Sequence, residues 1–107
     1  MTREEIWELP AGEEMDKAVA QLFKEGEFHI GTPPFSTKFC AAWKLVKKMI
    51  NDGWAFKMAH YGGEWHVCFG RKPSFIWDAI ATGPTPMVAI CRAVLICRLA
   101  EEVQHKR

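Results

Sequence analysis

The sequence predicts an α+β protein in which antiparallel strands pack against helices. Apolar residues recur every three or four positions between residues 36 and 51, which is helical spacing. They alternate with other residues from Trp54 to Tyr61 and from Glu64 to Phe69, which is strand spacing. Gly62-Gly63 between these two strands is typical of a hairpin turn. We therefore expect helices, strands and a further helix in that order along the chain.

The N-terminal residues carry two helix signals. Thr2 and Glu5 fit a capping box that begins a short helical turn, which Pro10 ends. A second helix is expected from about Glu13 to Lys24, with Gly26 as its stop. A loop rich in Gly and Pro is expected to follow and to lead into the helix at 36–51.

The helix at 36–51 has the clearest periodicity, with Ser36 or Thr37 as its N-cap and Asn51-Asp52-Gly53 as its end. Its expected buried face comprises Phe39, Ala42, Trp43, Val46, Met49 and Ile50. The residues expected to form the core of the protein are Trp43, Val46, Ile50, Phe56, Val67, Ile90 and Val94.

The C-terminal third is expected to hold a third strand and a last helix. Residues 74–81 are rich in β-branched and aromatic residues and predict a strand, with a helical turn as the alternative; polar turns are expected at 70–73 and 82–86. Thr85 and Pro86 then predict the start of a helix over 86–102. Its first three turns are apolar on nearly every side, unlike a surface helix. Either other parts of the domain cover it on two sides, or it meets another subunit. We expect a homo-oligomer through this helix.

The length and charge of the chain limit the classes of protein to which it can belong. The 107 residues are expected to form a single domain, 1–107, with an N-terminal arm at 1–12 and a frayed tail at 103–107. The formal net charge of +1 lacks the basic excess typical of nucleic-acid binders. A helix–three-strand–helix order also occurs in double-stranded-RNA-binding domains, but the last helix has no cation before Arg92 to contact phosphates. Double-stranded nucleic acid is therefore not an expected partner.

The N-terminus and the cysteines indicate the compartment. The charged start lacks the apolar run of a signal peptide, and Arg92 and Arg98 interrupt the most apolar segment, which is too short to span a bilayer. No CxxC pair is present, and apolar neighbours surround each cysteine. We expect a cytoplasmic protein without membrane contact. Its reduced thiols would be Cys40, Cys68, Cys91 and Cys97.

Three segments resemble the phage ABA-sandwich domain family. These are GEEMDKAVAQLF at 12–23, PPFSTKFCAAWKLVKKM at 33–49 and ATGPTPMVAICRAVL at 81–95. They occur in the family's order with the aromatic hairpin between them. Phe35 and Met87 stand where the family often has Tyr and Leu. The resemblance implies a phage or prophage origin, an α/β/α-type sandwich and no assigned activity.

Catalytic and metal chemistry have weak support in the sequence. His66 and Cys68 share a strand face, and His60 across the hairpin would make three zinc ligands, but no fourth ligand or metal-spacing motif is evident. Cys91 and Cys97 are six residues apart on a helix and do not share a face closely. We expect no metal, no cofactor and no catalytic residues, and hence not an enzyme.

Arg92 is the most informative polar residue, because it interrupts an apolar helix. It is expected either to pair with Asp16, Asp78 or a glutamate, or to snorkel to the surface, or to face an anionic ligand. Separately, aromatic and cationic residues between positions 54 and 77 could form a surface that holds bases and phosphates by stacking and positive charge. The alternative is that most of the tryptophans among them are core residues. The candidate ligand-binding residues are Arg92, Tyr61, Trp65, Arg71 and Lys72.

These observations predict a phage accessory protein that acts by binding in the host bacterial cytoplasm. By analogy with other small phage proteins, one form would be an anti-defence sponge that sequesters a small nucleotide signal between subunits. The alternative is a protein–protein interaction module that inhibits or recruits a host protein.

Overall fold

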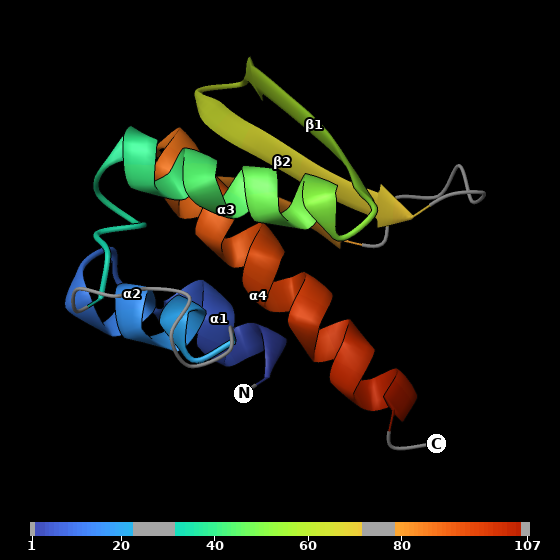
Figure 1. Ribbon diagram of the computed structural model, residues 1–107. Helices are drawn as coiled ribbons and strands as arrows, with labels where there is room; N and C mark the ends of the chain where they lie inside the picture. Colours follow the sequence, from blue (N-terminus) through green and yellow to red (C-terminus); the bar gives the residue numbers. More distant parts are fainter. Residues whose placement is uncertain (1, 23–31, 72–78, 106–107) are drawn as a thin grey trace.

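The computed structural model describes residues 2–22, 32–71 and 79–105, with side chains to Leu99 (Figure 1). Its elements are α1 (Arg3–Glu8), α2 (Glu13–Ala20), α3 (Phe39–Asn51), β1 (Trp54–Tyr61), β2 (Glu64–Arg71), β3 (Ala79–Gly83) and α4 (Pro86–His105). The expected α+β class is confirmed: N-terminal helices, a three-stranded antiparallel sheet and a C-terminal helix on that sheet.

The sheet has the order β1-β2-β3. β1 and β2 form an unbroken hairpin from the pair Trp54–Arg71 to the pair Tyr61–Glu64. The turn needs Gly62 and Gly63, whose φ angles of 63° and 78° are rarely adopted by residues with a side chain. Side chains alternate between faces, so Val67 and Phe69 of β2 point toward the helices.

The first strand has the bounds that the sequence predicted, and the other two differ. β2 continues to Arg71, because Gly70 and Arg71 still pair with β1, so the turn expected at 70–73 is wrong for these two residues. Residues 72 and 73 lie outside the described residues. β3 spans Ala79–Gly83 and includes Thr82 and Gly83, which were expected in a break. Gly83 lies against α4: a Cβ there would be 2.9 Å from the Ala89 nitrogen. Residues 74–78 of the expected strand lie outside the described residues, as do Lys24 and Gly26.

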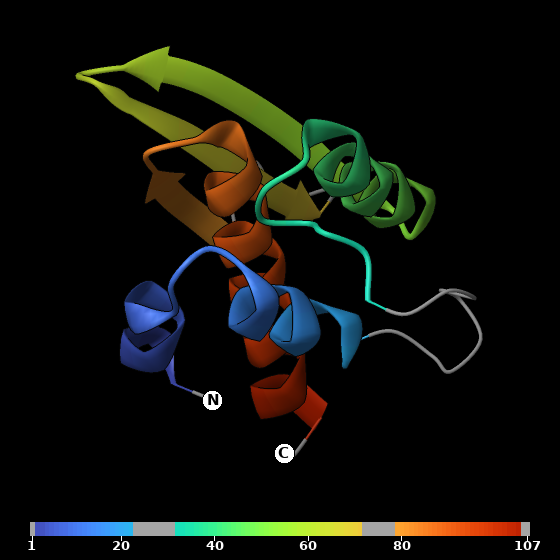
Figure 2. The same ribbon diagram turned by 90° about the vertical axis from the view of Figure 1, so that its left-hand side faces the viewer.

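The described helices lie on one side of the sheet (Figure 2). α4 contacts β2 and β3, and α3 lies beside it against β1. α1 and α2 pack on α4 and contact no strand in the described part of the chain. α4 therefore lies between the sheet and the N-terminal helices, with α3 along its flank.

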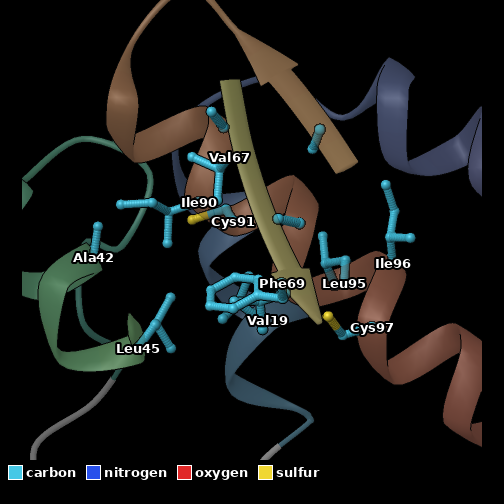
Figure 3. Close-up of a cluster of buried hydrophobic side chains, with 14 of the residues drawn as sticks. Val19, Ala42, Leu45, Val67, Phe69, Ile90, Cys91, Leu95, Ile96 and Cys97 are labelled. Atoms are coloured by element: carbon cyan, nitrogen blue, oxygen red, sulfur yellow. The ribbon is translucent and has the colours of Figure 1, made fainter. Parts of the chain in front are cut away.

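α4 is the centre of the core (Figure 3). The Thr85 hydroxyl accepts a hydrogen bond from the Val88 N–H at 3.1 Å, which confirms the expected N-cap. The α4 side chains that are at most 4% exposed are Val88, Ala89, Ile90, Cys91, Ala93, Val94, Leu95, Ile96 and Cys97. Of the two alternatives in the sequence, coverage within the domain is therefore observed. The apolar side chains from Val88 to Cys97, which suggested an oligomer interface, are buried within the chain, and the homo-oligomer itself stays a prediction.

α3 is rotated from the expected orientation. Its buried side chains are Ala41, Ala42, Leu45, Val46 and Met49. At 100° per residue, this face lies about 70° from the predicted one. The core prediction is wrong for Trp43 and Ile50, which are 37% and 47% exposed, and Phe56 is half-buried. It is confirmed for Val46, Val67, Ile90 and Val94.

The predicted caps had different outcomes. The Thr2–Glu5 capping box is confirmed. The N-cap of α3 is Lys38, which makes no side-chain capping bond, rather than Ser36 or Thr37. The reason is that the buried Ser36 binds α2 instead. Its backbone N–H and its hydroxyl both donate to Asp16 Oδ1, at 2.8 and 2.7 Å, and its hydroxyl oxygen accepts from the Gly12 N–H. This buried network joins the start of α2 to the segment before α3.

Val46 and Ile50 are one turn apart on α3 and provide a matched test of its orientation. Val46→Ala should lower the free energy of unfolding by about 1–3 kcal/mol, because it leaves a cavity in the core. Ile50→Ala removes a half-exposed side chain, so the loss should be clearly smaller. Urea denaturation measures both. A larger loss for Ile50→Ala would contradict this orientation of α3.

Candidate functional site

Arg92 joins three elements. Nη1 donates to the Thr82 carbonyl at the end of β3 at 2.9 Å, and Nη2 donates to the Trp7 carbonyl of α1 at 3.3 Å. The guanidinium also lies 4.7 Å from the centroid of the Trp7 ring, in cation–π geometry. Burial lowers the pKa of Arg92, and the charge of Glu64 acts in the opposite direction.

This arrangement differs from the carboxylate pairing that the sequence suggested for Arg92. Within the described part of the chain, its hydrogen-bond partners are two backbone carbonyls, while its buried Nε has none. Asp78 lies outside the described residues. Nη1 and Nη2 each donate one N–H to a carbonyl of another element, so in the described geometry Arg92 holds α1 and β3 against α4. Its expected role in binding an anion stays a prediction.

The other candidate ligand residues do not converge. Tyr61 and Trp65 lie near the hairpin turn, but on opposite faces of the sheet, since Trp65 is opposite His60 in the register. Arg71 is opposite Trp54 in the register, and Trp54 is seven residues from Tyr61 on β1. At ~3.4 Å per residue, Arg71 and Tyr61 are therefore about 24 Å apart along the strand direction. The Arg71 guanidinium lies 4.3 Å from the Trp54 ring centroid. Lys72 lies outside the described residues.

The three residues weighed as zinc ligands are also separated. His60 shares its sheet face with Trp65, at a ring distance of 4.7 Å, whereas His66 and Cys68 point to the other face. There the His66 ring stacks on Tyr61 at 3.9 Å. Among the described residues, no group of three His, Cys, Asp or Glu side chains is placed to hold a metal ion.

The four cysteine thiols lie in different environments. Cys91 and Cys97 are buried, Cys68 is half-buried and Cys40 is exposed. Burial raises the pKa of Cys91, with a further contribution from Asp16, and burial also raises the pKa of Cys68. Because the thiolate is the nucleophile, raised pKa values make both groups poor nucleophiles at neutral pH.

A surface that the sequence prediction missed lies on α3. Phe39, Trp43 and Ile50 are 44%, 37% and 47% exposed, and their spacing places them on one side of the helix. We call these three residues the α3 flank. The Phe39 and Trp43 rings stack at 6.0 Å with an interplanar angle of 17°. Trp43 also meets Phe56 of β1 edge-on at 5.9 Å, so the flank lies beside β1.

The other large exposed apolar side chains are scattered. Trp7 lies under the Arg92 guanidinium and Tyr61 stacks on His66, while Ile80 is on β3. The α3 flank instead groups three such side chains on one helix. The signal for it was in the sequence: apolar positions of α3 cover about 200° of the helix circumference, more than one buried face requires.

Positive charge surrounds the α3 flank. Residues 32–61 contain five lysines and a single carboxylate, Asp52, although the whole chain is nearly neutral. Asp52 already accepts a hydrogen bond from Arg98 Nη2 at 3.3 Å. The exposed lysines of this segment are Lys38, Lys44, Lys47 and Lys57. Lys57 points to the face of the sheet that is turned away from the helices, because it is opposite Cys68 in the register. The flank is therefore an apolar and aromatic strip beside the exposed lysines of α3.

The helices and the antiparallel sheet define an α+β protein, and comparison with known proteins gives its family. The model of the Phage ABA sandwich domain matches residues 6–95, so the chain belongs to that family. This confirms the resemblance seen in the sequence. No curated protein and no solved structure matches the chain. Within the described residues, no helix has the length and apolar character needed to cross a membrane.

The position of Arg92 predicts a structural effect of its removal. Arg92→Met keeps an unbranched apolar stem but leaves the carbonyls of Thr82 and Trp7 without their donor. The free energy of unfolding should fall by about 1–3 kcal/mol in urea denaturation. Arg3→Met, at an exposed position of α1, is the control and should change it by less than about 0.5 kcal/mol. Equal effects of the two changes would contradict a structural role for Arg92.

Proposed function

We propose that this phage protein acts by binding a protein partner through the α3 flank and the lysines around it, without catalysing a reaction. The observation that carries this proposal is the grouping of Phe39, Trp43 and Ile50 on one exposed side of α3. Monomeric proteins expose large apolar patches mainly where they bind something. Aromatic side chains are also enriched in the energetically important parts of protein interfaces.

Binding to a protein accounts for this surface better than nucleotide sequestration does. A nucleotide sponge would need cations and aromatic rings around one ligand. Arg71 and Tyr61 lie at opposite ends of the hairpin, and Arg92 donates to two carbonyls. We therefore place the protein–protein module first and the anti-defence nucleotide sponge second. In this proposal the chain is a phage accessory protein that inhibits or recruits a host protein in the bacterial cytoplasm.

The residues offer a matched pair of variants for the test. Trp43→Ala shortens an aromatic side chain of the α3 flank, and Tyr61→Ala shortens an exposed aromatic side chain at the hairpin turn. Tagged wild type and both variants are expressed in the bacterial host, and proteins that co-purify in a Trp43-dependent manner are identified. A purified candidate is then titrated with each protein by calorimetry. Trp43→Ala should weaken binding by at least about tenfold, and Tyr61→Ala should leave it unchanged.

The same experiments can also contradict the proposal. Equal affinity of wild type and Trp43→Ala for every co-purified protein would contradict binding through the α3 flank. Retention of a nucleotide by the wild type in native mass spectrometry, with loss in Tyr61→Ala but not in Trp43→Ala, would favour the sponge. The unfolding midpoint of each variant should be measured first, so that lost binding is not lost folding.

A further inference from the structure

We propose that the partner contributes an extended acidic segment, which adds a fourth strand to the open edge of β1 and directs its apolar side chains onto the α3 flank. This inference rests on the proposed protein-binding function and specifies its partner and its mode of docking.

The first support is the edge itself. Among the described residues, the order β1-β2-β3 leaves one side of β1 without a strand, and β1 has eight residues against five in β3. Every second residue of an antiparallel edge strand points its N–H and C=O away from the sheet. Natural edges are commonly protected by proline, bulges or several charges. β1 has an unbroken register, no proline and one charged residue, Lys57, so it can accept another strand.

The second support is the position of the α3 flank beside that edge. Trp43 contacts Phe56, which is half-buried on the face of β1 that is turned toward the helices. A new strand would lie about 4.8 Å beyond β1, and alternate side chains would point to the helical side. Phe39 and Ile50 are eleven residues apart, or about 16 Å along α3 at 1.5 Å per residue. Five or six residues of extended chain have this length, so three alternate side chains can cover the flank.

The third support is charge. Lys38, Lys44 and Lys47 are exposed on α3 or at its start, and Lys57 is exposed on the face of β1 that is turned away from the helices. The single carboxylate of residues 32–61, Asp52, is bonded to Arg98. Acidic side chains on the added strand would be attracted to these lysines, which would speed association and select against basic segments.

The same charges argue against two other occupants. A second copy related by a two-fold axis through β1 would bring the lysines of two chains together, which is unfavourable. Single-stranded nucleic acid also uses aromatic rings and lysines. However, Ile50 presents no ring to a base, and alternating N–H and C=O groups along an edge match another polypeptide strand. An acidic extended peptide would use the edge of β1, the α3 flank and the lysines together.

The test starts from random peptides, because no partner sequence is assumed. A display library of random twelve-residue peptides is selected on the wild-type protein, with peptides that also bind Trp43→Ala removed. The enriched peptides should be negatively charged, with apolar residues at every second position. A synthetic copy should bind the wild type about tenfold more tightly than it binds Trp43→Ala or the double variant Lys44→Glu/Lys47→Glu. Arg3→Glu, on α1, is the charge-reversal control and should bind like the wild type.

Strand addition has its own readout. Saturating peptide should slow amide hydrogen exchange at alternate residues of β1, and affinity should fall as sodium chloride is raised, because salt screens exposed charges. Three results would each overturn the proposal. The enriched peptides could lack acidic residues, their apolar residues could recur at helical spacing, or the peptide could leave hydrogen exchange in β1 unchanged. Displacement of the peptide by twelve-residue oligothymidine, or by dimers of the protein itself at higher concentration, would also overturn it.

These experiments distinguish a failure of the strand-addition proposal from a failure of the proposed protein-binding function. If Trp43-dependent peptides are basic or helical, the surface binds protein but the extended acidic segment is wrong. If no selected peptide depends on Trp43, strand addition is overturned. Titration of the co-purified partner with Trp43→Ala then decides independently whether the α3 flank binds a protein.

Discussion

The rest of the structure depends on the need to cover α4. This helix is apolar around most of its circumference, and the other described elements of the chain cover it. Two strands cover one side, α3 packs along another, and α1 and α2 cover the remainder. Burial of each large aliphatic side chain is worth about 1.5–3 kcal/mol, so this arrangement dominates the stability of the fold. Arg92, the one charged residue between Val88 and Cys97, is accommodated by carbonyls of the elements that enclose the helix.

Covering α4 also determines what stays exposed. α3 turns Leu45 and Met49 toward the core, and its apolar arc is too wide to be buried entirely. Phe39, Trp43 and Ile50 consequently remain at the surface, beside the exposed lysines of α3 and next to the edge of β1 that no described strand covers. The binding surface that we propose is thus a consequence of how the core is filled. Its aromatic rings are continuous with the interior, because Trp43 meets Phe56 and Phe56 in turn meets Phe69 at 5.4 Å. The interior can therefore hold Trp43 in one orientation for a partner.

Local signals in the sequence predicted much of the fold, and long-range contacts account for the errors. The alternation of β1, the Gly62-Gly63 turn and the Thr85 cap depend on neighbouring residues, and all were predicted. The orientation of α3 was not, because periodicity gives the width of an apolar face but not which part of it meets α4. Ser36 was misassigned because its partner, Asp16, is twenty residues away. Two residues of the candidate nucleotide site, Tyr61 and Arg71, do not come together within the chain, because they lie at opposite ends of a hairpin.

Residue-resolved hydroxyl-radical labelling of the purified wild-type protein tests most directly whether α4 is buried within one chain while the α3 flank is open. The labelling is performed at a concentration where light scattering gives the monomer mass. Phe39, Trp43 and Ile50 should be oxidised at rates near those of the unfolded protein, and Ile90, Val94 and Ile96 should be strongly protected. Rapid oxidation of these α4 residues in the monomer, together with protection of Phe39 and Trp43, would contradict the account.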